Sequence, residues 1–360
     1  MQIEVITSLS DAEALRPEWE ALLADAVKPS VFLTPEWLLT WWIAYGSDLD
    51  MYMIVVRDGG RLVGLFPMAF SGSGLQGWSN DYTDRFGPIV ARNGREAVEA
   101  GARHLVTVAR PWPVMNLLPL AKDSPATQWL TDALEAVGAG NRVTTWFRSP
   151  IIDLPADGSA LSEHLSGSFR GTLRRKTKTA DGMGVTAEIR TDAAALSEAL
   201  DVASDTWAHR EGTAIGSTGM NRRFYEGLAS AAAGRGWLRI GLLRDAGGRA
   251  IAFELNLLRG GGAVNLKLGY RESAGEMSPG LVLRGRVIDA LVEEGAETFD
   301  LLGSDESYKM HWTDRTVEHV RVRAFPPTVT GRGRHVYRHR VRPAVGRALK
   351  SIRRVADGDG

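Results

Sequence analysis

The chain has 360 residues, 44% hydrophobic and 24% charged, and its 43 basic and 43 acidic residues cancel, as is typical of a globular protein with two domains. No apolar run reaches the roughly 20 residues that cross a bilayer, and the N-terminus lacks the basic start and apolar core of a signal peptide, so we expect a cytoplasmic protein. The absence of cysteine excludes disulfides, thiol catalysis and cysteine metal sites.

The first half of the chain alternates strand-like and helix-like segments. Thr34 can cap a helix whose first turn holds Pro35, and Asp58-Gly59-Gly60 is a typical hairpin turn between two apolar strands. The elements predicted here are a strand at 2–7, helices at 12–26 and from 34, strands at 51–57 and 61–70, a helix at 128–137 and a strand at 141–146.

The second half repeats this order, with predicted helices at 193–210 and 221–233 and strands at 237–243 and 250–258. Its turn from Arg244 to Arg249 resembles the turn from Arg57 to Arg61, because an apolar strand lies on each side of both. The repeated order favours a duplicated domain, with a boundary near Pro150 to Pro155. We therefore expect domains at 1–150 and 151–330 and a tail at 331–360.

A glycine-rich turn from Arg259 to Gly262 joins two alternating strands. If it is the tip of a hairpin, Leu258 pairs with Ala263, and the register places Asn256 opposite Asn265 and Glu254 opposite Lys267. One face of this hairpin is then apolar and the other polar. The polar face either lines a substrate cleft or is a solvated face with a cross-strand ion pair.

A helix is predicted from Ser278 to about Glu294, with Ser278 as its N-cap and Pro279 in its first position. Gly280 leaves the backbone open to close approach, so bare amides at this helix start can bind a phosphate, such as the pyrophosphate of a coenzyme A thioester. With the strand at 299–303, the segment forms a crossover between parallel strands. Ligands favour the carboxyl ends of such strands, here 269–280 and 303–312.

These motifs together resemble the GNAT superfamily of acyltransferases, and more closely the cellulose-biosynthesis-type acetyltransferases, which are related to the Fem-type aminoacyltransferases. The resemblance covers most of residues 150 to 325. It implies an α/β fold of two tandem GNAT-like domains, with mixed central sheets flanked by helices. The segments that carry it are the Arg-rich stretch 169–176, Trp207 with Phe224-Tyr225, the hairpin, Ser278-Pro279-Gly280, the strand 299–303 and the stretch from Tyr308 to Trp312.

The resemblance implies transfer of an acyl group, with acetyl expected, from acetyl-CoA or another acyl-CoA to an amine or hydroxyl. The acceptor would be a small molecule or a lipid-linked sugar, in envelope polysaccharide or metabolite biosynthesis. Two alternatives stay open. One is a Fem-like transfer from charged tRNA, and the other is a non-catalytic GNAT shell that only binds a ligand.

Acyl transfer needs a base for the acceptor proton and an acid for the leaving thiolate. Glu254 is the candidate base, and the alternative is an ion pair with Lys267. Tyr308 is the candidate acid, a role implied by the resemblance, and the alternative is packing against Trp312. Lys309 could bind a phosphate or carboxylate, or be a surface lysine. Asp305 could select an amine, or be a solvated loop residue.

Several further residues are candidates for binding the cofactor or the substrate. Arg174 belongs to a basic cluster at 170–178 that either grips phosphates or forms a solvated helix face. No metal-ligand spacing is visible, so we expect no metal. The predicted cofactor-binding residues are Ser278, Pro279, Gly280, Leu281 and Arg174, and the predicted substrate-binding residues are Trp207, Asn256, Lys267, Tyr270, Asp305, Lys309 and Trp312.

The chain ends in a basic tail. Between Gly331 and Arg354 there are nine Lys or Arg residues and no acid, which leaves 34 basic against 43 acidic residues elsewhere. Residues 344–355 have a weak amphipathic pattern. The tail could contact an anionic membrane near a lipid-linked acceptor, bind RNA, pack over the acidic body or stay partly disordered.

Overall fold

The computed structural model describes residues 1–80, 83–107, 111–206 and 214–336, and the chain divides into two compact units. Unit 1 comprises Met1–Leu33, Asp48–Trp146 and the chain from His319 onwards, and unit 2 comprises Thr34–Ser47 and Phe147–Glu318. Both units are discontinuous in sequence. The continuous domains at 1–150 and 151–330 that the sequence indicates stay a prediction.

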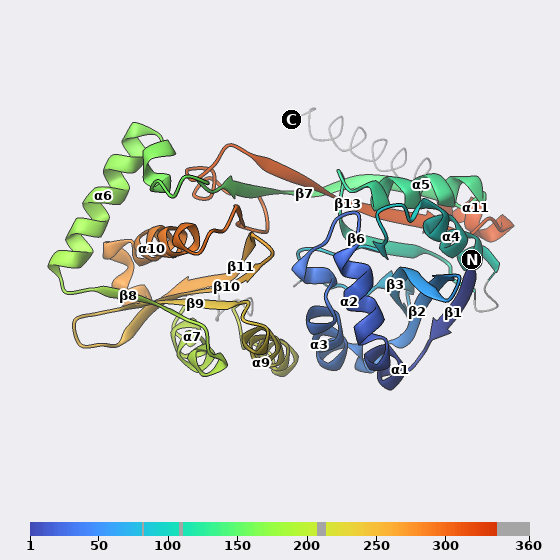
Figure 1. Cartoon of the computed structure of the whole chain (residues 1–360), viewed down its shortest axis with the longest axis horizontal. Helices are drawn as coiled ribbons and strands as arrows, with labels where there is room; N and C mark the ends of the chain where they lie inside the picture. The colour runs from blue at the N-terminus through green and yellow to red at the C-terminus, as the bar shows by residue number, and fades with distance from the viewer. Residues whose placement is uncertain (81–82, 108–110, 207–213, 337–360) are drawn as a thin grey trace, which may run out of the picture. The chain divides into compact units, whose positions relative to one another are not determined.

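Unit 1 contains a mixed sheet with helices (Figure 1). Its strands, in spatial order, are β1 (Gln2–Ile6), β2 (Asp50–Asp58), β3 (Arg61–Ser71), β4 (Gly74–Gly77), β6 (Met115–Ala121) and β13 (Thr316–Phe325), with β5 (Ile89–Val90) on β3. Its helices are α1 (Leu9–Ala14), α2 (Arg16–Ala24), α4 (Arg95–Thr107), α5 (Pro125–Ala136) and α11 (Val329–Val336), with a short 3-10 turn at Val31–Leu33.

The hairpin of β2 and β3 confirms the strand pair predicted from the sequence. Asp58 pairs with Arg61, and Gly59 and Gly60 have φ angles of 55° and 85°, which is the backbone that a two-residue turn with the strand twist requires. The single helix predicted at 12–26 is wrong, because Pro17 cannot continue a helix and instead lies in the first turn of α2.

Unit 2 has a mixed sheet with helices on both faces, which confirms the α/β fold class (Figure 1). Its strands, in spatial order, are the part of β7 (Gly140–Asp153) from Phe147 onwards, β12 (Thr298–Asp300), β11 (Gly262–Tyr270), β10 (Ala250–Arg259), β9 (Leu238–Arg244) and β8 (Thr186–Arg190). Its helices are α3 (Pro35–Tyr45), α6 (Gly167–Gly182), α7 (Leu196–Ser204), α9 (Gly219–Gly234) and α10 (Pro279–Glu293), with 3-10 turns at Gly46–Asp48, Leu161–His164, Ala193–Ala195 and Glu272–Met277.

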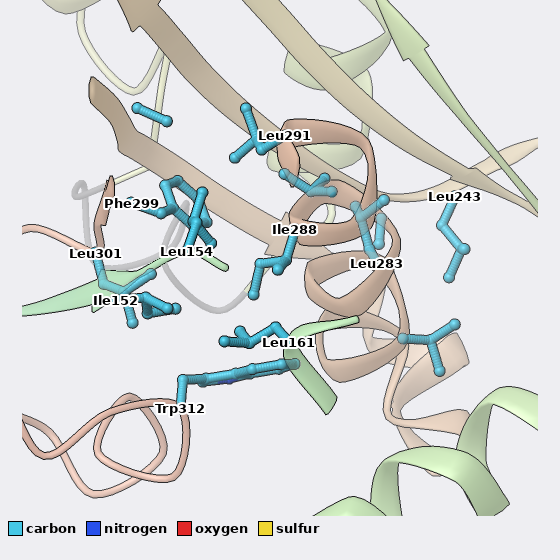
Figure 2. Packing of buried hydrophobic residues seen from close by; sticks show 14 of the residues in the cluster. Ile152, Leu154, Leu161, Leu243, Leu283, Ile288, Leu291, Phe299, Leu301 and Trp312 are labelled. Atoms are coloured by element: carbon cyan, nitrogen blue, oxygen red, sulfur yellow. The ribbon is translucent and has the colours of Figure 1, made fainter. Parts of the chain in front are cut away.

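The pair of β11 and β12 is parallel, and α10 is the crossover between them, as the sequence predicts. Helix α10 lies over one face of the sheet and α7 over the other (Figure 1). Because α10 covers the strands with one face, its apolar side chains enter the core of unit 2. Leu283, Ile288 and Leu291 of α10 join Phe299 of β12 in one buried cluster (Figure 2).

No helix in the part of the chain that the structure describes is long and apolar enough to span a bilayer.

His319 on β13 predicts a pH dependence of stability. Its side chain is buried, and desolvation, with smaller contributions from Arg85 and Lys28, lowers the pKa of its imidazole from 6.5 to about 2. Because the pKa of His319 is lower in the folded state, its neutral imidazole contributes fully to stability above about pH 6.5. The free energy of unfolding should fall as pH drops below that value, by about 1.4 kcal/mol per pH unit. Urea unfolding between about pH 6.5 and 5.5 measures this slope.

The matched control is His164, which lies on the surface of the chain. We expect His319→Gln to remove the slope and His164→Gln to leave it unchanged. An unchanged slope in the His319 variant would show that another group protonates on unfolding.

Candidate active site

The hairpin of β10 and β11 has the predicted register near its tip but not further along. Leu258 pairs with Ala263 and Asn256 with Asn265, as expected. A β-bulge then adds Leu266 to β11, so that Lys267 pairs with Leu255 and Glu254 pairs with Leu268. The predicted pairing of Glu254 with Lys267 is therefore wrong. Cross-strand partners share a face, so Lys267 and Glu254 lie on opposite faces of the sheet.

The carboxylate of Glu254 forms a buried ion pair under α10. Arg284 Nε donates to Glu254 Oε1 at 2.6 Å, and both side chains are nearly inaccessible to solvent. A second Arg284 nitrogen donates to Asn265 Oδ1 at 2.9 Å, and Asn265 donates to Asn256 Oδ1 at 2.8 Å. Glu254, Asn256 and Asn265 thus belong to one buried network, instead of the cleft-lining or solvated face expected.

Burial raises the pKa of Glu254 above its ordinary value of 4.5, and the nearby Arg284 guanidinium partly opposes this shift. Its second oxygen, Oε2, has no hydrogen-bond partner among the described residues. A carboxylate with a raised pKa and an open acceptor atom has the properties of a general base.

Helix α10 begins at the predicted position, with Ser278 as N-cap and Pro279 in the first turn. The Ser278 side chain makes no capping bond, contrary to expectation, because its backbone is left-handed with a φ of 55°. Pro279 has no amide hydrogen, and Leu281 donates its amide to the Ser278 carbonyl at 3.0 Å. Of Pro279, Gly280 and Leu281, only Gly280 has an amide hydrogen that makes none of the hydrogen bonds described. The helix start therefore offers a phosphate fewer free amides than the sequence predicts.

A cavity of about 240 Å³ lies at the end of β11, and Leu268, the cross-strand partner of Glu254, is among its lining residues. The bulge directs Lys267 towards this cavity, which Tyr270 and Tyr308 also line. Apolar side chains from β10, β11 and the end of α7 form part of its walls. The remaining lining residues are Ala203, Thr206, Ala214, Ile215, Phe253 and Gly269.

Tyr308 lines this cavity and brings a phenolic hydroxyl to it. Desolvation raises its pKa to about 12, the charges of Glu306 and Glu254 add to this rise, and the Arg284 guanidinium partly opposes it. The hydroxyl therefore keeps its proton at neutral pH and can donate it. Half of the side chain is accessible to solvent, so a ligand can reach the hydroxyl.

The loop after β12 is held by Lys309. Its ammonium donates to the carbonyl of Leu302 at 2.8 Å and pairs with Glu306 Oε2 at 2.6 Å, and its side chain is buried. Leu302 and Gly303 have positive φ angles of 52° and 61°, so the chain turns sharply here. The alternative of a surface lysine is wrong, and the ammonium is engaged within the loop. Asp305 is exposed on the same loop.

Two other predicted binding residues lie away from the cavity. Trp312 is buried and packs edge-on against Phe169 of α6 at 5.0 Å. Arg174 is exposed on α6. Both line a separate groove between α6 and α10. Trp207 lies outside the described residues.

Arg284 is the central residue that the sequence-based prediction missed. It lies three residues after Leu281 and three before Val287, so it falls on the apolar stripe of α10. An arginine on a buried helix face needs a buried acid as its partner. The arginine within the apolar pattern is therefore the signal that could have identified Glu254 as that partner. Thr206 and Phe253 were also missed, because only the fold brings α7 and β10 to the same cavity.

Comparison with protein families finds one match, which covers part of unit 2. Residues 167–310 match the family model described as "Acetyltransferase (GNAT) domain". The matched range contains the β10–β11 hairpin, α10, β12 and Tyr308. No curated protein matches the sequence.

Three solved structures are similar to most of the chain. The crystal structure of FemX is 13% identical over 89% of this chain and 97% of that chain, with a TM-score of 0.63. The C-terminal domain of a putative lysylphosphatidylglycerol synthetase from Agrobacterium fabrum is 11% identical over 88% and 92%, with a TM-score of 0.56. L-PGS from Bacillus licheniformis is 14% identical over 89% and 96%, with a TM-score of 0.54. At these identities the likeness shows the fold.

Proposed function

We propose that this chain transfers an acyl group from a coenzyme A thioester to an amine or hydroxyl acceptor, and that the transfer takes place at the end of β11. The observation that carries the proposal is the cavity lined by Lys267, Tyr270 and Tyr308, next to the start of α10 within the GNAT-type domain. Parallel strands joined by a crossover helix bind ligands at their carboxyl ends. The acyl group is acetyl in this proposal, and the acceptor belongs to a polysaccharide or a small metabolite.

In the proposed reaction, the acceptor nitrogen or oxygen attacks the thioester carbonyl carbon, and the carbon–sulfur bond breaks. Tyr308 donates its phenolic proton to the leaving thiolate, since its pKa of about 12 keeps it protonated. Glu254 Oε2 accepts, through water, the proton that the acceptor loses and then releases it to solvent, while solvent restores the proton of Tyr308. The Gly280 amide at the start of α10 binds a pyrophosphate oxygen of the donor.

A thiol-release assay tests the proposal. The chain has no cysteine, so a thiol-reactive dye reports only the released coenzyme A. We expect thiol release from acetyl-CoA in the presence of amino-sugar acceptors. Gly280→Trp should abolish it, because a β-carbon at Gly280 lies 3.7 Å from the Tyr270 ring and an indole there would fill the helix start.

The control is Gly219→Trp. Gly219 is the first residue of α9, and a β-carbon there meets no atom within 4 Å. This variant should bind and react as the unchanged chain does. If no acyl-CoA is turned over or bound in calorimetry, acyl-CoA is not the donor.

Tyr308→Phe removes the proposed acid. We expect kcat to fall by about 100-fold, at the lower end of the effect of general acid catalysis, with little change in KM because the ring remains. Steady-state thiol release at neutral pH measures both constants. A variant with unchanged kcat would exclude Tyr308 as the proton donor.

A second candidate function is aminoacyl transfer from charged tRNA, which the likeness to FemX and to the two lysylphosphatidylglycerol synthetase structures favours. The same cavity would then receive an aminoacyl ester, and its leaving group would be a ribose hydroxyl. Release of a labelled amino acid from charged tRNA, measured beside thiol release, separates the two donors. The basic tail, mostly outside the described residues, would contact an anionic membrane in either case.

A further inference from the structure

A groove of about 670 Å³ lies between α6 and α10, apart from the cavity at the end of β11. Arg170, Arg174 and Lys178 line it from α6, each four residues after the last. This spacing places them on one face of the helix, about 6 Å apart along its axis. The groove therefore has a row of three cations along one wall.

These three cations differ from most arginines of unit 2. Arg239, Arg244 and Arg271 each bind a carboxylate. Arg170, Arg174 and Lys178, in contrast, have no carboxylate within ion-pair distance among the described residues, although Arg170 makes a long bond of 3.4 Å to the Glu163 carbonyl. Their charges are therefore available to a ligand.

Two carboxylates of the groove partly offset this charge. Arg286 and Asp289 of α10 line the groove, and Arg286 pairs with Asp181 of α6 at 2.9 Å. Four cations thus face two carboxylates, and one carboxylate already has its partner. The groove keeps a net positive charge, concentrated along α6.

The lining of the groove also includes glycines and an apolar end. Gly171 lies between Arg170 and Arg174 in sequence, and a β-carbon there would meet no atom within 4 Å. Leu161 and Trp312 form the apolar end, and they lie beside each other in the core (Figure 2). The groove is large enough for a small organic molecule, and it joins a cationic wall to an apolar end.

We propose that the groove between α6 and α10 binds a ligand that carries a diphosphate. Guanidinium groups bind phosphate oxygens through paired hydrogen bonds, and a lysine adds a point charge. The non-phosphate part of the ligand contacts Leu161 and Trp312. The diphosphate could come from a nucleoside diphosphate on the acceptor, or from coenzyme A, whose pyrophosphate would then lie here instead of at the Gly280 amide. Only the assignment to donor or acceptor rests on the proposed function.

Calorimetry with the full chain at low salt tests the site with inorganic pyrophosphate, ADP, UDP and coenzyme A. We expect Arg174→Gln to weaken binding about tenfold, the effect of losing one charge-assisted hydrogen bond. The matched control is Arg175→Gln, which removes the same charge from the next residue of α6 but not from the groove lining. It should change binding less than twofold.

Gly171→Leu is an independent variant. It should obstruct binding, while the free energy of unfolding should not fall, because glycine is less favourable than leucine in a helix. Tighter binding of coenzyme A than of ADP assigns the groove to the donor, and preference for UDP assigns it to the acceptor. Absence of binding to all four probes, or equal weakening by Arg174→Gln and Arg175→Gln, overturns the proposal.

The thiol-release assay separates this proposal from the proposed function. If the unchanged chain releases thiol but binds no diphosphate in the groove, only the proposal of a diphosphate site is refuted. Binding that depends on Arg174 without thiol release from any acceptor would refute the acyl transfer and leave the groove as a diphosphate site.

Discussion

Replacing Glu254 with alanine is expected to lower the free energy of unfolding by about 3–5 kcal/mol, because it leaves the buried Arg284 guanidinium without its carboxylate. The ion pair lies beneath α10, where water cannot replace the lost partner. Urea unfolding followed by circular dichroism measures the change.

Two controls give this prediction its specificity. Glu226→Ala removes a carboxylate from an exposed pair with Arg222 and should cost about 0.5 kcal/mol or less. The double variant Glu254→Leu with Arg284→Met removes both charges and should recover most of the lost stability. A loss of less than about 1 kcal/mol in Glu254→Ala would contradict the assignment of Arg284 as a buried, dependent cation.

Glu254→Gln is expected to reduce kcat for thiol release by about 10²- to 10⁴-fold, the range for removal of a general base. Glutamine keeps the size of the side chain and an oxygen that can accept from Arg284, so this variant changes the chemistry more than the packing. Near-normal turnover of a folded Glu254→Gln protein would leave Glu254 with a purely structural role.

The pH profile distinguishes a base from a structural carboxylate. A base acts when it is deprotonated, so the rate of the unchanged chain should fall as pH drops through the raised pKa of Glu254, above its ordinary value of 4.5. Glu254→Gln should lose this limb in its residual activity. A structural effect would scale the whole profile without changing its shape.

The fold could be predicted from the sequence because local signals agree with the tertiary structure. Thr34 caps α3 by accepting the Trp37 amide, and Pro279 begins α10. The β2–β3 and β10–β11 hairpins follow from their glycine turns. Helix limits were less predictable where a proline divides an amphipathic pattern, as in α1 and α2.

The candidate site was predicted only in part, for reasons that the structure makes clear. The sequence pattern identified the polar hairpin residues, but a bulge depends on packing against both faces and leaves no local signal in this chain. Glu254 was therefore assigned to the wrong partner. Lys309 was read as exposed or ligand-binding, because the carbonyls that hold it belong to a turn whose shape only the folded loop defines.

The bulge at Leu266 also makes the chemistry of this hairpin depend on its length. Deleting one residue there would restore the uninterrupted register, and Lys267 would move to the face where Arg284 already lies. Two cations would then share one carboxylate in a buried layer, while the cavity would lose its ammonium. Redesign of acceptor preference should therefore exchange side chains at constant strand length, since a single insertion or deletion changes both stability and cavity charge together.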